Sequence, residues 1–329
     1  MKNWCWGAVA VFLSCSAPAQ EASHCKILKL ASLPIDFSGL QPSLHAKFNG
    51  VDLHLVMDSG ATTTTLFPSA VHDAGLEEIH SDLTSVGVGG MVHTFVAFAK
   101  DVEIGPSRGT NLRFLGTSET QIHGADGLLG ADYLFRTDLE LMLRDKQVVF
   151  LQAEGCGGGP ISYWDPDAPW IESHDVSGMD LRQQVDVRIN GHVFTALLDS
   201  GAQRSVLDLN AAAKIGLAPE SEGIESAGEL SGVGSRKQAV WRARIESFEI
   251  GPEAIRNTKI QIADLYGAAR NDHGRQTKVS GADMILGADF IRAHHLLFAR
   301  SQHRLYFTYL GGQVFSLEAA AAPSSPPAQ

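Results

Sequence analysis

The chain carries the same ordered set of short motifs twice. Residues 55–64 read LVMDSGATTT, and residues 196–205 read ALLDSGAQRS. Three pairs of motifs share one offset: an Asn-Gly pair at 49–50 and 190–191, the acidic residue at 58 and 199, and a Gly-Leu pair at 75–76 and 216–217 (191 − 50 = 199 − 58 = 217 − 76 = 141). Several matches at one offset indicate an internal duplication.

The order of the motifs is kept further along the chain while their spacing grows. VEIGP ends at residue 106 and FEIGP at residue 252, and GADGLLGADYL begins at residue 124 whereas GADMILGADFI begins at residue 281. The second copy is therefore expected to contain longer loops. With 329 residues, of which 44% are hydrophobic, the chain is long enough to bury the cores of two lobes.

Composition along the chain predicts the limits of these lobes. The glycines and prolines of EGCGGGPISYWDPDAPW are typical of a linker, and AAAAPSSPPAQ is typical of a disordered tail. We expect a signal peptide at 1–19, an N-terminal lobe at 26–155, a linker at 156–178, a C-terminal lobe at 179–310 and a disordered tail at 311–329.

Each copy is predicted to consist mainly of strands. Apolar and polar residues alternate at 51–57, HVFTALL precedes the second Asp-Ser-Gly-Ala, and HTFVAFAKDVEI and QAVWRARIESFEI have the pattern of longer strands. PSAVHDAGL and LNAAAKIGL predict short helices. Asp132 and Asp289 are expected to cap two further short helices, at 133–135 and 290–292.

The first residues have the pattern of an export signal. Lys2 precedes an apolar stretch at 4–13, and Ala17-Pro18-Ala19 has the form of a signal-peptidase site. Ten apolar residues are half of the roughly 20 that span a bilayer, so export to the periplasm or medium is expected, without stable membrane insertion. A lipid anchor on Cys15 is the weaker alternative, because Phe12-Leu13-Ser14 fits the usual preceding pattern poorly.

Export affects the interpretation of the cysteines. Cleavage after Ala19 leaves Cys25 and Cys156, and in an oxidising compartment they are expected to form a disulfide; two unpaired thiols are the alternative. The 13 His residues show no HExxH frame, and no Cys-x-x-Cys is present, so neither a metal nor a cofactor is expected. A net charge of −11 disfavours nucleic acid as a partner.

Three parts of each copy resemble the retropepsin-like branch of the aspartic proteases. These parts are a strand ending in Asp-Ser-Gly-Ala, a glycine-rich hairpin some thirty residues later, and an apolar-apolar-Gly element before a short helix. The resemblance covers nearly all of residues 45–150 and 180–307. It implies an all-β fold of two pseudo-twofold-related β-barrel lobes with short helices and a cleft between them, fused in one chain as in bacterial aspartyl proteases.

The resemblance assigns roles to residues of both copies. It implies the catalytic pair Asp58 and Asp199, supported by the loop residues Ser59, Gly60, Ala61, Ser200, Gly201 and Ala202. Residues Gly87, Val88, Gly89, Gly90, Gly232, Val233 and Gly234 resemble flap tips that close over a substrate. The serine hydroxyls are expected to hydrogen-bond to the backbone of the opposite lobe, and the loop glycines to permit a tight turn.

The chemistry of peptide hydrolysis explains why two copies are needed. One carboxylate takes a proton from water while a neighbouring carboxylic acid protonates the carbonyl oxygen. Two ionised carboxylates about 3 Å apart would repel by about 5 kcal/mol at an effective dielectric constant of 20. A single shared proton is the general property of aspartic protease dyads, and the repeat makes Asp58 and Asp199 the candidates for such a dyad in this chain.

The chain departs from related enzymes at two places. Ala61 and Ala202 stand where pepsin-like enzymes have Ser or Thr, so the dyad lacks a hydroxyl donor and a mildly acidic optimum near about pH 5 to 6 is expected. The Ala of each LGAD stands where retroviral enzymes have Arg, so the salt bridge of those enzymes is absent.

The preferred hypothesis is an exported aspartic endopeptidase that binds peptides or proteins in an extended conformation. A monomer is expected because both lobes lie in one chain. A catalytically inactive peptide-binding module of the cell envelope is the first alternative, and facing carboxyl groups of Asp58 and Asp199 would argue against it. A structural protein of the envelope is the second, and it would be favoured by a cleft filled with the linker or with side chains.

Overall fold

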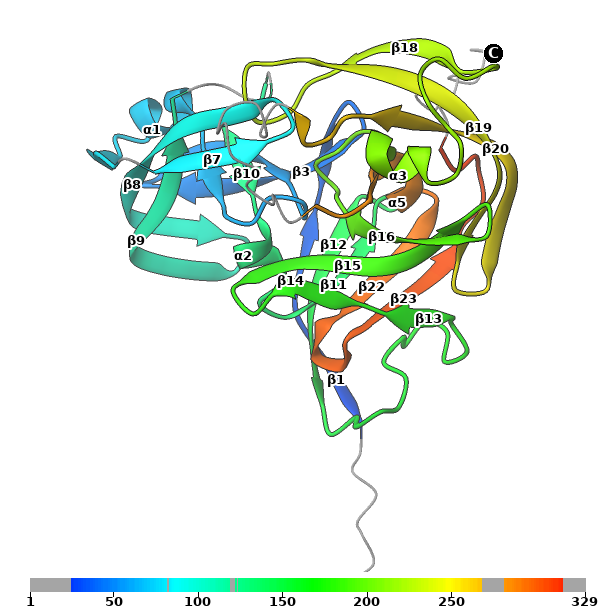
Figure 1. The fold of residues 1–329 in the computed structure, drawn as a ribbon. Coiled ribbons are helices and arrows are strands. Elements are labelled where there is room, and N and C mark those ends of the chain that lie inside the picture. The colour runs from blue at the N-terminus through cyan, green and yellow to red at the C-terminus, as the bar shows by residue number, and fades with distance from the viewer. Residues whose placement is uncertain (1–24, 82, 119–121, 123, 268–280, 316–329) are drawn as a thin grey trace, which may run out of the picture.

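The computed structural model describes residues 25–81, 83–118, 122, 124–267 and 281–315. The predicted signal peptide at 1–19 and most of the predicted tail lie outside the described residues. Strands dominate the described part, and they form three sheets with a few short helices, as the all-β prediction requires. Figure 1 shows two lobes above and beside a sheet that contains β11, β12, β22 and β23.

The first lobe, called lobe 1, is built on a nine-stranded sheet in the order β2-β3-β4-β10-β5-β9-β8-β6, with β7 paired to β8. Its elements are β2 (Asp36–Ser38), β3 (Gln41–Phe48), β4 (Val51–Met57), β5 (Thr65–Leu66), α1 (Pro68–Asp73), β6 (Glu77–Ile79), β7 (Thr84–Gly87), β8 (Gly90–Ile104), β9 (Ser107–Thr117), β10 (Gly127–Leu129) and α2 (Ala131–Leu134).

The second lobe, called lobe 2, is built on an eight-stranded sheet in the order β14-β15-β16-β21-β17-β20-β19-β18. Its elements are β14 (His174–Ser177), β15 (Asp180–Ile189), β16 (His192–Leu198), β17 (Val206–Asp208), α3 (Leu209–Ala213), β18 (Glu225–Leu230), β19 (Gln238–Ile250), β20 (Glu253–Ala263), β21 (Met284–Leu286) and α5 (Ala288–Ile291).

The two lobes repeat one topology. In lobe 1, β4 pairs parallel with β10, β10 antiparallel with β5, and β5 parallel with β9. In lobe 2, β16, β21, β17 and β20 repeat these pairings in the same order and sense. The duplication inferred from the motif spacing is therefore confirmed in the fold.

A third, six-stranded sheet joins the lobes. It runs in the order β1-β12-β11-β22-β23-β13, from β1 (Lys26–Pro34), β11 (Asp138–Met142), β12 (Gln147–Glu154), β13 (Trp170–Glu172), β22 (His294–Ala299) and β23 (Arg304–Tyr309), with the 3₁₀ helix η1 (Arg300–Gln302) between the last two. The central pair β11 and β22 brings the two halves of the chain together, with Glu140 opposite Leu297. One hydrophobic core extends through both lobes, so packing fixes their relative position.

The strand and helix predictions hold at most places. Residues 51–57 form β4 with Leu53, Leu55 and Met57 buried, and QAVWRARIESFEI forms β19. The predicted capping by Asp132 and Asp289 is wrong. Glycines occupy the N-cap positions of α2 and α5 without a side-chain cap, and both aspartates lie inside the first turn, where their carboxylates bind other loops.

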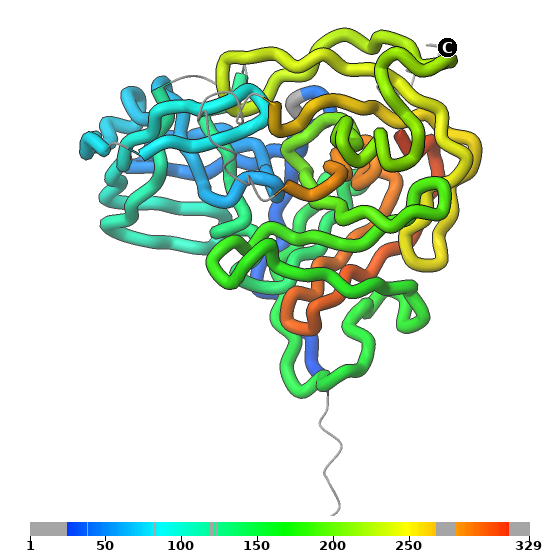
Figure 2. Tube along the Cα trace, in the orientation of Figure 1, coloured from blue at the N-terminus to red at the C-terminus, as the bar shows by residue number. Residues whose placement is uncertain are grey.

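The segment 156–178 contributes to the sheets. It contains β13 and β14, and Trp164 stacks on His295 of β22 with ring centroids 3.9 Å apart. The tube in Figure 2 shows this segment running below the lobes before the chain enters lobe 2. At the other end of the described chain, Phe315 is buried against Phe248 and Phe290 of lobe 2. The domain limits drawn from composition stay a prediction.

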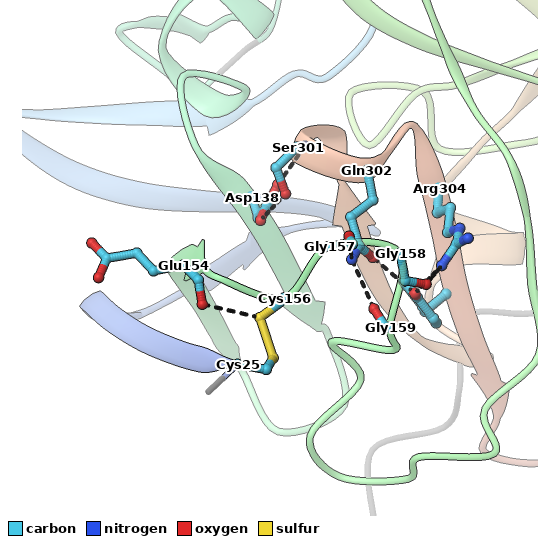
Figure 3. The surroundings of a disulfide bond; sticks show 11 residues. Cys25, Asp138, Glu154, Cys156, Gly157, Gly158, Gly159, Ser301, Gln302 and Arg304 are labelled. Carbon is cyan, nitrogen blue, oxygen red and sulfur yellow. Dashed lines mark hydrogen bonds between the residues drawn. A yellow bond between two sulfur atoms is a disulfide. The ribbon is translucent and has the colours of Figure 1, made fainter. Parts of the chain in front are cut away.

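The predicted disulfide is confirmed. Cys25 precedes β1 and Cys156 follows β12, and their sulfur atoms are bonded across a sequence separation of 131 residues (Figure 3). The loop beside the disulfide is held by second-half residues, because Gln302 Nε2 donates to the carbonyl oxygens of Gly157 and Gly159, and Arg304 Nη1 donates to that of Gly158. The bond thus closes a long loop next to a contact between the two halves of the chain.

Removing the disulfide is expected to lower the free energy of unfolding. Closing a loop of this length restricts the unfolded chain by about 3 to 5 kcal/mol in chain-entropy models. Urea denaturation of the double variant Cys25→Ser/Cys156→Ser, compared with the unreduced protein, measures the difference. An unchanged midpoint would show that the disulfide contributes nothing to stability.

No helix among the described residues has both the length and the apolar character needed to cross a membrane.

Candidate active site

The two Asp-Ser-Gly-Ala segments form loops at the ends of equivalent strands. Asp58 follows β4, and its N–H donates to the carbonyl oxygen of Leu129 at 3.0 Å; Asp199 follows β16, and its N–H donates to Leu286 at 2.9 Å. In each case the acceptor is the last residue of a parallel neighbouring strand, β10 or β21. Each loop is therefore an extension of the central strand pair of its lobe.

Reciprocal hydrogen bonds of the two serines connect the loops. Ser59 Oγ donates to the carbonyl oxygen of Leu198 at 2.8 Å and accepts from the N–H of Ser200 at 2.9 Å. Ser200 Oγ donates to that of Met57 at 2.6 Å and accepts from the N–H of Ser59 at 3.1 Å. Both serines are fully buried, and hydrogen bonds between buried groups are costly to lose. The contact fixes the distance between the loops.

The glycines after the serines allow the two loops to approach closely. A Cβ at Gly201 would lie 2.3 Å from Cγ of Asp58, and a Cβ at Gly60 would lie 2.3 Å from Cγ of Asp199. Each carboxyl group thus packs against the glycine of the opposite lobe. Any side chain at these positions would occupy the space of the carboxyl group.

The two carboxyl groups are hydrogen-bonded to each other, and this contact changes their acidity. Burial, followed by the charge and hydrogen bond of Asp199, raises the pKa of Asp58 well above its ordinary value, although backbone N–H groups of Ala61 and Gly60 lower it. Burial also raises the pKa of Asp199. Four groups act in the opposite direction and lower it: the N–H of Ala202, the hydrogen bond with Asp58, the N–H of Gly201 and the guanidinium of Arg182. The pair therefore holds a proton at a pH at which an isolated Asp is ionised.

A second layer of hydrogen bonds supports each loop, and the sequence patterns did not predict it. In lobe 1, Asp132 Oδ1 accepts from the N–H and the hydroxyl of Thr64 at 2.8 and 2.7 Å. In lobe 2, Asp289 Oδ1 accepts from the same groups of Ser205 at 2.8 and 2.6 Å. Burial raises the pKa of Asp289 to about 6, against the hydrogen bonds from Ser205. Each aspartate thus ties its short helix to the chain after the Asp-Ser-Gly-Ala loop.

These supports had one recognisable signal in the sequence. Thr64 and Ser205 stand at the repeat offset of 141 residues and both carry a hydroxyl, as the serines of the loops do. The glycine before each short helix permits the contact, since a Cβ at Gly130 or Gly287 would lie 2.6 Å from the backbone of the opposing segment.

The glycine-rich hairpin tips of the two lobes meet. The N–H of Gly89 donates to the carbonyl oxygen of Val233 at 2.8 Å, and the N–H of Arg236 donates to that of Gly89 at 3.0 Å. Neither Gly87 nor Gly234 has room for a Cβ. A Cβ at Gly87 would lie 2.4 Å from Cβ of Val233, and a Cβ at Gly234 would lie 2.2 Å from the carbonyl carbon of Gly89. The tips are thus joined by backbone hydrogen bonds, and the space between them leaves no room for a side chain at Gly87, Gly89 or Gly234.

The valines of the tips pack into the opposite lobes. Val88 of lobe 1 contacts an apolar cluster of lobe 2 that includes Val206 and Leu265, and Val233 of lobe 2 contacts a cluster of lobe 1 that includes Val56 and Phe67. The remaining predicted tip residues, Gly90 and Gly232, flank this contact, and Gly90 begins β8. The structure therefore brings the predicted flap residues of both copies together.

In the described ranges, no group of three or more His, Cys, Asp or Glu side chains is arranged to hold a metal ion.

Comparison with known proteins identifies the family. The family model described as aspartyl protease matches residues 44–133 and 185–290, which together are more than half of the chain. The chain therefore belongs to the aspartyl protease family, with one match in each lobe, and the predicted resemblance is confirmed.

The fold is similar to that of a solved aspartic proteinase. The structure of the aspartic proteinase from Irpex lacteus superposes with a TM-score of 0.54 at 13% sequence identity, over 88% of this chain and 99% of that chain. At this identity the likeness concerns the fold. No curated protein matches the chain.

Proposed function

We propose that the protein is an exported aspartic endopeptidase that uses Asp58 and Asp199 as its catalytic dyad. The contact between these two carboxyl groups, one from each copy of the repeat, carries the proposal. Membership of the aspartyl protease family supports peptide hydrolysis as the reaction class. The repeated topology supplies one acid from each lobe.

The reaction needs no covalent intermediate. One ionised carboxylate removes a proton from a water molecule as its oxygen attacks the carbonyl carbon of the peptide bond, and the neutral carboxylic acid donates its proton to the carbonyl oxygen. In the tetrahedral intermediate the C–N bond then breaks as the carboxylic acid formed from the base gives its proton to the amine nitrogen, and one hydroxyl of the intermediate gives its proton to the other carboxylate. This leaves a carboxylic acid, an amine and a dyad with one proton. The hydrogen-bonded serines keep the two acids at the short separation that this exchange requires.

The joined hairpin tips provide the binding element for the substrate. An extended peptide can replace the contacts between Gly89, Val233 and Arg236 with backbone hydrogen bonds of its own. Val88 and Val233 would then contact apolar side chains of the substrate. The tips must separate before a peptide enters, so opening is part of the proposed cycle.

Two further observations bear on the hypotheses raised by the sequence. A peptide-binding module without turnover does not need facing carboxyl groups, so their contact favours the enzyme. The disulfide between Cys25 and Cys156 supports an oxidising compartment, and with the export signal predicted at 1–19 it supports a periplasmic or secreted protein.

The pH dependence of hydrolysis tests the dyad. Activity is expected to fall at low pH as the second proton neutralises the base, and at high pH as the shared proton leaves, with an optimum near about pH 5 to 6. The raised pKa of Asp58 shifts the high-pH limb upward from the value of an ordinary Asp. Rates of cleavage of a fluorogenic peptide across this range measure both limbs.

Adding hydroxyl groups at positions 61 and 202 is expected to shift only one limb of the pH profile of hydrolysis. In the variant Ala61→Ser/Ala202→Ser, a hydroxyl that donates to the ionised carboxylate lowers its pKa, and the low-pH limb shifts downward by about one pH unit. An optimum below about pH 3 in the unmodified protein would show that another hydrogen-bond donor already lowers the pKa of the ionised carboxylate.

A further inference from the structure

Gln41 and Arg182 occupy equivalent positions in the two lobes but differ in charge. They stand at the repeat offset (182 − 41 = 141), near the starts of the equivalent strands β3 and β15. Gln41 Nε2 donates to the carbonyl oxygen of Gly201, and Arg182 Nη1 donates to that of Gly60 at 3.3 Å. Each side chain thus reaches the glycine of the opposite loop, and only the one from lobe 2 is charged.

The contact with Gly60 places the guanidinium near one particular carboxyl group. Gly60 is the glycine that packs against Asp199, whose Cγ would lie 2.3 Å from a Cβ at that position. Arg182 and Asp199 therefore both contact Gly60. In lobe 2, Asp58 and the neutral amide of Gln41 both contact the equivalent glycine, Gly201.

The guanidinium is held in a fixed position. Asp180 accepts from Nε of Arg182 at 2.9 and 3.1 Å and from Nη2 at 2.6 Å, and the Arg182 side chain is only 20% exposed. Such two-pronged pairing orients the planar group and leaves Nη1 directed at the opposite loop. The negative charge of Asp180 offsets part of the positive charge of Arg182, but Arg182 is the member of this pair that contacts the opposite loop.

We propose that Arg182 decides which member of the dyad is ionised: Asp199 keeps the negative charge and acts as the general base, and Asp58 carries the shared proton and acts as the general acid. Arg182 is a positioning residue in this assignment, because it acts through the dyad. The inference rests on the proposed dyad and goes beyond it, since the symmetry of two copies alone leaves the two acids equivalent.

The acidities agree with this geometry. Burial raises the pKa of both aspartates, and the charge of Asp199 raises that of Asp58 further, to well above its ordinary value. The pKa of Asp199 is lowered by the N–H of Ala202, by Asp58, by the N–H of Gly201 and then by the charge of Arg182, which has no counterpart at Asp58. The other titratable groups facing Arg182 are Asp180 on the same strand and Tyr266 after β20. The Tyr266 hydroxyl donates to the carbonyl oxygen of Ala282 at 2.8 Å, and burial, followed by the charge of Asp208, raises its pKa, so it stays neutral across the working range.

The chain offers its own matched substitution. In Arg182→Gln the new residue is the one that already fills the equivalent position of lobe 1, so the contact with Gly60 can be kept while the charge is lost. In the exchange variant Gln41→Arg/Arg182→Gln the charge moves to the other lobe, and Arg182→Lys keeps a positive charge at the original place.

Carboxyl ¹³C NMR of the purified protein labelled at aspartate measures the effect without any substrate, with the variants Asp58→Asn and Asp199→Asn used to assign the two signals. We expect Asp199 to be the site that ionises first in the unmodified protein and in Arg182→Lys. In Arg182→Gln the lower titration step is expected to rise by about one pH unit, and in the exchange variant Asp58 is expected to ionise first.

An unchanged order of ionisation in the exchange variant would overturn the proposal, as would Asp58 ionising first in the unmodified protein. The titration is independent of turnover, so a protein that titrates as expected and cleaves no peptide would refute the proposed function and leave the assignment of the proton standing. Where hydrolysis is observed, the low-pH limb of kcat/KM in Arg182→Gln is expected to rise with the NMR titration. A change in KM alone would contradict the electrostatic role.

Discussion

Replacing either dyad aspartate with asparagine is expected to lower kcat/KM for peptide hydrolysis by about 10³-fold or more. Asn keeps the shape of the side chain and can accept the N–H of Gly60 or Gly201, as Asp58 and Asp199 do. It transfers no proton at working pH, so the general acid or the general base is lost. The measurement is the initial rate of peptide cleavage by Asp58→Asn and by Asp199→Asn.

The control for this experiment is an asparagine substitution outside the site. Asp186 lies exposed on β15, and Asp186→Asn is expected to leave kcat/KM unchanged. Circular dichroism and the urea midpoint establish that all three variants are folded. Substantial turnover by folded Asp199→Asn would contradict a mechanism that needs one acid from each lobe.

Adding a single methyl group at Gly201 is expected to have the second largest effect. A Cβ at this position lies 2.3 Å from Cγ of Asp58, so Gly201→Ala must displace the carboxyl group or separate the lobes. Overpacking of this kind costs about 1 to 3 kcal/mol of stability, and a displacement of the acid by about 1 Å can lower the rate by about 10²-fold. Urea denaturation and the rate of cleavage report the two effects separately.

Gly158→Ala is the matched control for this substitution. A Cβ at Gly158 would have no neighbouring atom within 4 Å, and the backbone there is not left-handed, so the same change in composition is expected to alter neither stability nor rate. Full activity of Gly201→Ala would contradict the close approach of the two loops.

The repeat accounts for most of what could be predicted from the sequence. Equal spacing of motifs predicts two copies of one unit, and two copies of one topology place Asp58 and Asp199 at equivalent strand ends. The alternation at 51–57 predicts β4 and its buried face, because side chains of a strand alternate between its two sides.

Contacts between distant segments could not be predicted in the same way. Asp132 and Asp289 each precede the residues of a predicted short helix, which is the local pattern of a capping residue. Each instead binds a hydroxyl side chain more than 65 residues away from it, Thr64 or Ser205. Local preference favours the cap, whereas the packing of the short helix against the loop decides the outcome. The insertion of Val88 and Val233 into opposite lobes depends in turn on how the lobes are joined through β11 and β22.

Gln41 and Arg182 illustrate a further limit. Their shared offset is visible in the sequence, but the repeat alone does not connect a residue 17 positions before an Asp with the carboxyl group of the same lobe (58 − 41 = 199 − 182 = 17). The connection runs through Gly60 of the other lobe, and it is visible only when the two loops are packed together.

Mass spectrometry of peptide fragments is the most direct test of the claim that two copies of one unit form a single peptidase. The mature protein is incubated with a mixture of unstructured peptides at about pH 5 to 6, the range expected for a dyad that holds one proton, with and without a pepstatin-type inhibitor. We expect new fragments from the unmodified protein, none with the inhibitor, and none from folded Asp58→Asn or Asp199→Asn. Peptides left intact by a folded, unmodified protein across the acidic and neutral range would contradict the proposed function, and fragments that persist in both variants would contradict the dyad.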